Sequence, residues 1–171
     1  MKAEVPGKNE SLNFVLDSGA GVSVLDLGRA RALGARVGKP ELVQGVDGRA
    51  VAYRVDDFQA VSGGITLPKW VLAINLQPIS KYCHEPIDGI LGIEFFRGRI
   101  VQIDFAARKV RVLHRHGLSL ANREILPIKR CNDAICVPVR VAGNPAQWMR
   151  LNTGCDASLE WVVSGRREKA D

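Results

Sequence analysis

Short apolar runs separated by turn-forming residues follow one another along most of this chain. Runs of this length are typical of β-strands rather than of helices. The segment 26–34 is an exception, because Asp26 can cap the start of a short helix and Gly34 can end it. One further helical turn is predicted at 93–96. The pattern predicts an all-β fold, with strands at 12–16, 22–25, 67–76, 87–92, 100–105, 109–113, 135–141 and 147–151.

A β-hairpin is predicted over residues 42–57. Val51, Tyr53 and Val55 alternate with the residues between them, as a strand with two different faces requires. Asp47-Gly48 supplies the tight turn, since both residue types tolerate the backbone angles that a two-residue hairpin loop needs.

The composition fits a globular protein of one domain, or of one domain and part of another. The chain has 171 residues, of which 46% are hydrophobic and 25% charged. No apolar segment is long enough to span a bilayer, and the N-terminal residues lack the apolar core of a signal peptide. The compartment stays open: periplasmic or secreted if a leader has been removed, cytoplasmic otherwise.

The net charge of +6 raises the question of a nucleic-acid partner. Lys and Arg are scattered along the chain, and the one dense group is Arg166, Arg167 and Lys169. Scatter of this kind is typical of a solvated surface. We therefore expect no nucleic-acid partner and no membrane contact, and a polyanion-binding β domain has only the net charge in its favour.

The four cysteines leave two readings open. Cys131 and Cys136 flank a predicted turn and could form a disulfide in an oxidising compartment; otherwise all four thiols are free and mostly buried. Cys83-His84, His114 and His116 do not have the spacing of a zinc site. We expect no metal and no other cofactor.

One short pattern occurs twice, 135 positions apart. The stretch 16–23 (LDSGAGVS) aligns without a gap with 151–158 (LNTGCDAS), and an apolar strand precedes each. Around 116–124 the pattern loosens, and strands begin again after it. We therefore predict a complete unit in residues 1–116 and the opening of a second, similar unit in 117–171.

Asp17 is the candidate for chemistry. A carboxylate at the end of a buried strand is held rigidly and partly desolvated, the Ser18 hydroxyl can hydrogen-bond within the loop, and Gly19 lets the backbone turn tightly. Where two such loops face each other, two carboxylates cannot both ionise easily, so they share a proton. One then takes a proton from water while the other protonates the carbonyl oxygen of a substrate.

With these residues in view, the chain resembles the retropepsin-like aspartic proteases. The strand followed by Asp17-Ser18-Gly19-Ala20 resembles the catalytic motif of that family, with Ser in place of the commoner Thr. Ile90-Leu91-Gly92 resembles the family's second signature, two apolar residues and a Gly, which packs beside the catalytic loop. The resemblance covers roughly residues 3–113 and implies a small closed barrel with Asp17 as the catalytic residue.

The resemblance also assigns a flap, a hairpin that closes over substrate. Residues 42–57 fall where the family has it, and Gly45, Asp47 and Gly48 are the flap residues in this reading. Asp88, which precedes the second signature, is expected to be structural rather than catalytic.

The second unit departs from the family pattern. Its loop, Asn152-Thr153-Gly154, has an amide where a second Asp is expected, and an amide can neither act as a general base nor share a proton. It also lacks a flap and an apolar-apolar-Gly segment, although the tandem repeat is similar to that of bacterial two-lobed relatives. Activity is therefore expected to need a second Asp, from another chain in a homodimer or from a complete second lobe. Asn152→Asp alone is expected to restore little.

Two functions are consistent with these patterns. The first is an aspartic-type endopeptidase that hydrolyses peptide bonds with a water activated by Asp17. The alternative is a catalytically silent module that holds an extended peptide in the same cleft without cutting it. Both have a peptide or protein as the ligand.

Overall fold

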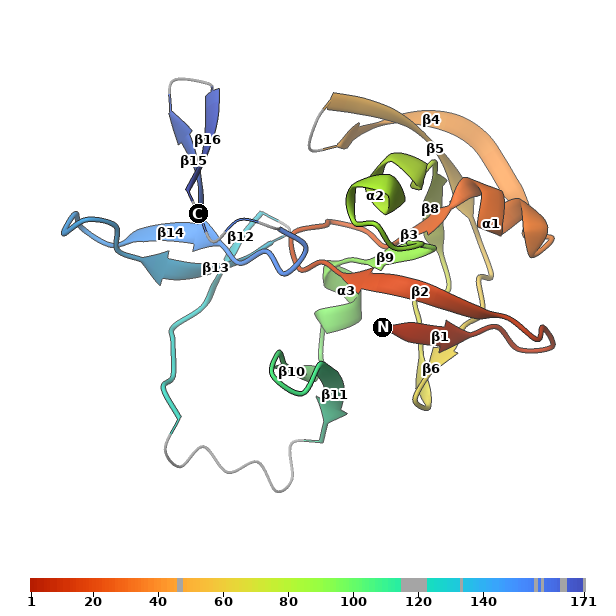
Figure 1. Cartoon of the computed structure of the whole chain (residues 1–171), viewed down its shortest axis with the longest axis horizontal. Coiled ribbons are helices and arrows are strands. Elements are labelled where there is room, and N and C mark those ends of the chain that lie inside the picture. The colour runs from red at the N-terminus through yellow and green to blue at the C-terminus, as the bar shows by residue number, and fades with distance from the viewer. Residues whose placement is uncertain are drawn as a thin grey trace.

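The computed structural model describes residues 1–45, 48–114, 123–132, 134–155, 157, 159–163 and 166–170. Strands dominate this part of the chain and its helices are short, so the all-β fold class is confirmed (Figure 1). None of the helices in this part is long and apolar enough to cross a membrane. The elements are β1 (Lys2–Glu4), β2 (Ser11–Leu16), β3 (Val24–Asp26), α1 (Leu27–Ala32), β4 (Val37–Gly45), β5 (Gly48–Val55), β6 (Val61–Ser62), β7 (Ile65–Thr66), β8 (Val71–Ile74), α2 (Gln77–Tyr82), β9 (Gly89–Leu91), α3 (Ile93–Phe96), β10 (Ile100–Asp104), β11 (Lys109–Leu113), β12 (Lys129–Cys131), β13 (Ala134–Val139), β14 (Gln147–Arg150), β15 (Leu159–Val163) and β16 (Arg166–Ala170).

The largest sheet has nine strands, in the order β4-β5-β8-β3-β9-β2-β1-β6-β7. Within it, β2 pairs in antiparallel fashion with β1 and in parallel with β9. The sheet is open, because its end strands β4 and β7 are not paired with each other in the described residues. The closed barrel that we predicted is therefore wrong. The end strands explain the difference, since β7 has only two residues and β4 is engaged with β5 alone.

The core is built from alternate residues of the strands. In β2, Leu12 and Phe14 are buried while the first residue is exposed, as expected for a strand with one face inside. Leu25 of β3 and Leu91 of β9 are also fully buried in the same cluster. The loops at the ends of β2 and β9 therefore rest on a packed base.

The capping predicted for the first helix is confirmed. Asp26 Oδ1 accepts a hydrogen bond from the N–H of Arg29 at 3.0 Å, at the start of α1. Gly34 follows the helix with a φ of 74°, a backbone angle that glycine adopts without strain. The helical turn predicted at 93–96 is present as α3.

The predicted hairpin is present as β4 and β5: β4 begins five residues earlier than predicted, β5 ends two residues earlier, and the register pairs Gly45 with Gly48. Asp47 lies outside the described residues. Val51 is half exposed although Val55, on the same face by alternation, is buried. The difference arises because β8 pairs only with the last three residues of β5, so the rest of the hairpin extends beyond that strand.

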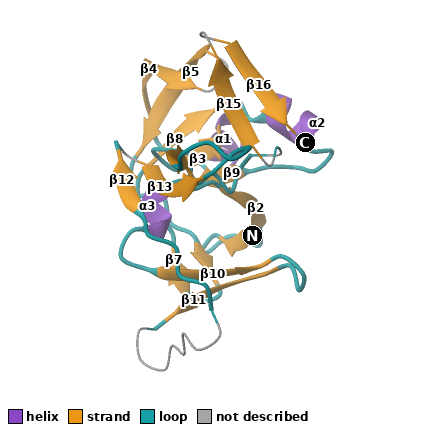
Figure 2. Cartoon of the chain, turned by 90° about the vertical axis from the view of Figure 1, so that its left-hand side faces the viewer, coloured by secondary structure: helices purple, strands orange, loops and turns teal. Residues whose placement is uncertain are grey.

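The remaining strands form smaller sheets. β10 and β11 make the predicted hairpin, at the opposite end of the molecule from β4 and β5 (Figures 1 and 2). β12, β13 and β14 form a three-stranded sheet, and β15 pairs with β16. The predicted boundary between residues 116 and 117 falls outside the described residues. Figure 1 shows the three-stranded sheet beside the loop that follows β2.

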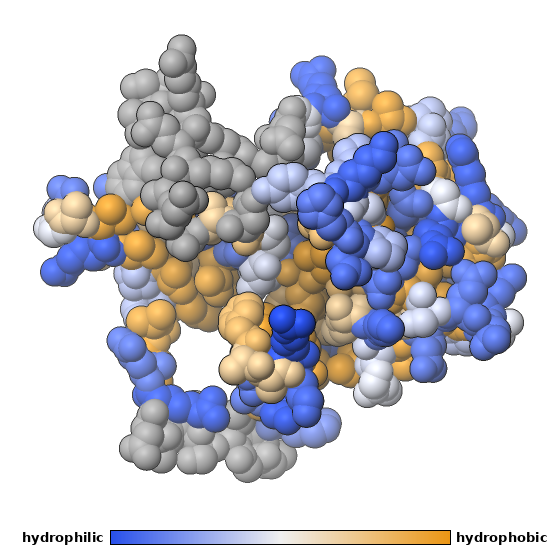
Figure 3. All heavy atoms as spheres, viewed as in Figure 1, coloured by the Kyte–Doolittle hydropathy of each residue, from blue (hydrophilic) through white to orange (hydrophobic). Residues whose placement is uncertain are grey.

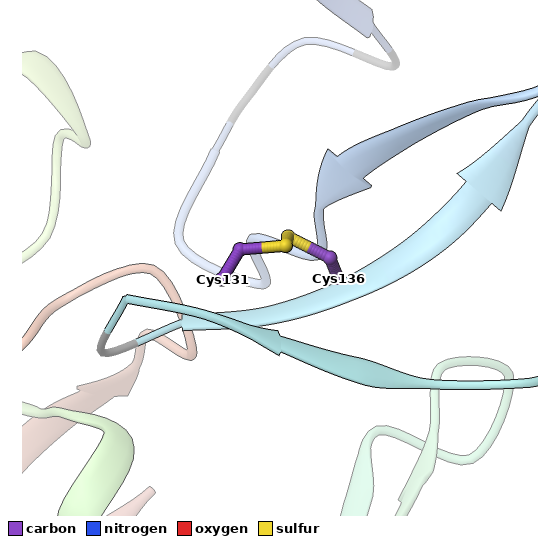
Figure 4. Close-up of a disulfide and its surroundings, with 2 residues drawn as sticks. All are labelled: Cys131 and Cys136. Carbon is purple, nitrogen blue, oxygen red and sulfur yellow. A yellow bond between two sulfur atoms is a disulfide. The ribbon is translucent and has the colours of Figure 1, made fainter.

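A disulfide joins Cys131 and Cys136 between β12 and β13, with their Cα atoms 6.0 Å apart (Figure 4). The reading with four free, mostly buried thiols is therefore wrong. Cys83 is free and exposed, and Cys155 is free and half-buried.

Candidate active site

Asp17 directly follows β2, inside the nine-stranded sheet. Its N–H donates to Leu91 O at 2.9 Å, and the parallel register places Leu16 opposite Leu91. The structure thus brings the Asp17 loop against Ile90-Leu91-Gly92, as the order of the two sequence signatures predicts. A Cβ on Gly92 would lie only 2.6 Å from the carbonyl carbon of Val22, so only glycine fits at this contact.

The Asp17 carboxylate is held by its own loop. Its Oδ1 accepts the N–H of Gly19 at 2.8 Å and the N–H of Ala20 at 3.2 Å. The described residues place no other hydrogen bond on this carboxylate. Since backbone donors fix one oxygen, the second oxygen is available to a water or a substrate.

The Asn152 loop is interlocked with the Asp17 loop through hydroxyl groups. Ser18 Oγ donates to Leu151 O at 2.7 Å and accepts the N–H of Thr153 at 3.2 Å. In return, Thr153 Oγ1 donates to Leu16 O at 2.7 Å and accepts the N–H of Ser18 at 3.1 Å. Each hydroxyl therefore donates to the carbonyl just before the opposite loop and accepts an N–H from within that loop. Because the two sets of bonds are equivalent, a local two-fold symmetry relates the two loops.

The same symmetry relates Asp17 to Asn152. Asn152 Oδ1 accepts the N–H of Gly154 at 2.9 Å, just as Asp17 Oδ1 accepts that of Gly19. Each of these side chains also lies against the glycine of the opposite loop. A Cβ on Gly19 would come within 2.7 Å of Asn152 Oδ1, and one on Gly154 within 2.8 Å of Asp17 Oδ1. Asn152 therefore occupies the position that faces Asp17.

The two loops differ in their surroundings. Asp17 is half-buried, whereas Asn152 is exposed. Arg150, which precedes the second loop, donates from Nη1 to Gly19 O at 3.3 Å, and its counterpart in the first unit, Val15, can make no such bond. The site is thus asymmetric in charge: the first loop carries a carboxylate, and the strand before the second loop sends a guanidinium across to the backbone of the first loop.

The interlock predicts that Ser18 and Thr153 stabilise the protein as a pair. Ser18→Ala and Thr153→Ala should each lower the free energy of unfolding by about 1–3 kcal/mol, because each leaves partly buried backbone groups without partners. The double variant should cost less than the two single losses together, since both hydroxyls belong to one network. Urea unfolding measures all three.

Ser62→Ala is the control for that experiment. Its hydroxyl also donates to a backbone carbonyl, that of Lys2, but the bond is exposed. A loss below about 0.5 kcal/mol is expected there. Strictly additive losses at Ser18 and Thr153 would show that the two hydroxyls do not act together.

Asp88 is structural in its contacts, as expected. It is 4% exposed, and its carboxylate accepts Arg29 Nε at 2.7 Å and the N–H of Asn13 at 2.8 Å. The hydrogen bond and the charge of Asp88 raise the pKa of the Arg29 guanidinium above its usual value. The pair ties β9 to α1 and β2, and Arg29 is a supporting residue that sequence reasoning missed.

Removing the Asp88 carboxylate should destabilise the fold. Asp88→Ala leaves the N–H of Asn13 and the Nε–H of Arg29 without their partner, although the guanidinium keeps its 3.8 Å ion pair with Glu10. We expect a loss of about 2–4 kcal/mol of unfolding free energy. Asp56→Ala is the matched control, because Asp56 pairs with Arg54 at a similar distance on the open surface. That loss should stay below about 1 kcal/mol. Equal losses in the two variants, measured by denaturant unfolding, would contradict the expected role of Asp88.

A second supporting group lies behind the Asp17 loop. Ser23 is buried; its Oγ accepts the N–H of Gly92 at 2.9 Å, and its own N–H donates to Glu94 Oε1. Glu94 Oε2 is buried without a hydrogen-bond partner among the described residues. Ser23 belongs to the repeated stretch 16–23, which was the one sequence signal for this cluster.

The flap residues are placed only in part. Gly45 and Gly48 pair at the end of the β4–β5 hairpin, and Asp47 is outside the described residues. The hairpin connects to the site through the sheet, since β5 pairs with β8 and β8 with β3, which follows the Asp17 loop. Closure of this hairpin over Asp17 stays a prediction.

The fold and the site together define a class of protein. An Asp-Ser-Gly loop on an all-β sheet, braced by an apolar-apolar-Gly strand and interlocked with a second loop of its kind, is the arrangement of an acid protease. Residues 1–95 match the aspartyl protease family, so this chain belongs to that retropepsin-like family. Among curated proteins, no relative matches the chain.

Proposed function

We propose that this chain is an aspartic-type endopeptidase in which Asp17 activates the attacking water. The observation that supports this most is the Asp17 carboxylate itself, fixed on one oxygen by Gly19 and Ala20 at the end of a buried strand. The other oxygen takes the proton of a water, whose oxygen adds to the peptide carbonyl carbon. The tetrahedral adduct then collapses, the C–N bond breaks, and Asp17 returns its proton to the leaving amine.

The residue that faces Asp17 determines how fast peptide hydrolysis can proceed. A carboxyl there would protonate the carbonyl oxygen as the water attacks. Asn152 offers an amide, which can donate a hydrogen bond to the developing oxyanion but has no proton to transfer. Hydrolysis by the intact single chain should therefore be slow, and full activity should need a second Asp loop.

A second candidate function is peptide binding without hydrolysis. The position of Asn152 opposite Asp17 favours this function. The amide preserves the geometry of a two-loop site, but it removes one of the two acid–base groups. The ligand in that case is also an extended peptide, bound across the Asp17 and Asn152 loops by its backbone.

One experiment separates the two functions. The intact chain is incubated with a mixed peptide pool from acid to neutral pH, and products are identified by mass spectrometry, with Asp17→Asn as the control. New peptide ends that appear with the intact chain and not with the control support the endopeptidase. Peptides that are retained on the immobilised protein but never cut support the binding module. Equal cleavage by the Asp17→Asn variant would rule out Asp17 as the catalytic group.

A further inference from the structure

One edge of β14 is unpaired at the place where β2 has a neighbour. β14 leads into the Asn152 loop as β2 leads into the Asp17 loop, and each has an antiparallel partner on one side, β13 and β1 respectively. On its other side, β2 is paired with β9 in parallel. β14 is an end strand of its sheet among the strands that the structure describes.

The hydrogen-bonding groups on this edge follow from the register. Leu151 N–H donates to Ile135 O at 2.8 Å, toward β13. Backbone groups point to alternate sides along a strand, so those of Trp148, Arg150 and Asn152 point toward the open edge. This short row of donors and acceptors is a site for adding a strand.

The first unit shows what such an edge binds. The residues 135 positions earlier are Asn13, Val15 and Asp17, and they face β9. Asp17 N–H donates to Leu91 O at 2.9 Å, and Asp88 N–H donates to Asn13 O at 2.8 Å. The equivalent N–H of Asn152 has no hydrogen-bond partner within the described residues.

Apolar side chains in β14 and directly after it are partly exposed to solvent. Trp148 is 42% exposed and Leu151 is 44% exposed, whereas Leu16, the counterpart of Leu151, is half-buried. Figure 3 shows apolar residues at the surface of the molecule around β13 and β14. A strand along β14 would cover part of this surface, as β9 covers β2.

We propose that the open edge of β14 binds an extended segment of another polypeptide, which adds as a parallel strand of the Gly-apolar-apolar-Gly type. β9 is the template for that sequence: a Cβ on Gly89 would overlap the ring of Phe14, and Leu91 fills the core. A second copy of this chain cannot supply the strand from its own β9, because that strand is buried in its own sheet. The proposal rests on strand pairing and not on hydrolysis by Asp17.

Amide hydrogen exchange tests this, with the synthetic peptide PIDGILGI (the sequence of residues 86–93) as the probe. Added to the intact protein, the peptide should bind saturably and slow exchange at Trp148, Arg150 and Asn152. Exchange at Gln147, Met149 and Leu151 should change much less, because those N–H groups already face β13. This alternation is specific to strand addition at the β14 edge, and protection without it would overturn the proposal.

Two matched pairs sharpen the result. Arg150→Pro removes one edge N–H and should weaken peptide binding at least about tenfold, while Arg150→Ala, which keeps that N–H, should change it less than about threefold. A peptide N-methylated at the position of Leu91 cannot pair and should not bind, and this test needs no protein variant. Equal binding of both peptides, or self-association of the free protein that protects the same amides, would exclude the proposed partner.

Discussion

Replacing Asn152 by aspartate is expected to raise peptide hydrolysis by at least about 100-fold in kcat/KM, because it supplies the acid that the site lacks. From sequence alone we expected little from this change, since the second unit has neither flap nor apolar-apolar-Gly segment. The structure alters that expectation: four hydrogen bonds between the loops already hold residue 152 opposite Asp17. The measurement is cleavage of a fluorogenic peptide by dilute, monomeric protein.

The control for that gain is the double variant Asp17→Asn/Asn152→Asp. It has one carboxyl, as the native chain does, but on the other loop. Its activity should fall back to about the native level, because the two carboxyls act as a unit rather than separately. No gain in the single variant, with the fold intact by circular dichroism, would mean that residue 152 is not positioned for proton transfer.

Removing residues 117–171 is expected to have the second large effect. In the intact chain the Asn152 loop occupies the Ser18 hydroxyl and the backbone around it. A chain of residues 1–116 leaves these groups open, so two copies can pair their Asp17 loops about a two-fold axis. Activity per chain should then rise with protein concentration, and should exceed that of the intact chain by about 100-fold or more once the dimer is formed.

Sedimentation and activity should be followed together in that experiment. The dimer and the activity should appear over the same concentration range, and Ser18→Ala in the short chain should shift both to higher concentration. Asp17→Asn should leave the dimer and abolish the activity. A folded short chain that stays monomeric, or a dimer without activity, would contradict the proposed pairing.

The features that could be predicted from sequence depend on residues close together in the chain. The cap at Asp26, the hairpin across Gly45 and Gly48, and the loop after β2 all follow from local pattern and turn chemistry. The contact between Asp17 and Leu91 could also be predicted from the sequence, although only because two motifs occur in the order found in a known family.

What could not be predicted depends on distant partners. Closure of a barrel is decided by the end strands β4 and β7, and nothing in either strand's own pattern shows that they stay apart. The salt bridge of Asp88 with Arg29 joins residues 59 positions apart, and the interlock of Ser18 with Thr153 joins residues 135 apart. The repeat indicates that a second loop exists, but the partners of its hydroxyl depend on how segments 135 positions apart come together.

The interlock of the two loops assigns assembly and chemistry to different atoms. The hydroxyls of Ser18 and Thr153 and the surrounding backbone hold the loops together, and neither the Asp17 carboxylate nor the Asn152 amide takes part in those four bonds. An acid can therefore be exchanged for an amide at position 17 or 152 while the hydrogen bonds between the two loops stay intact. A protein built this way can lose or regain catalysis by single substitutions without having to evolve a new architecture.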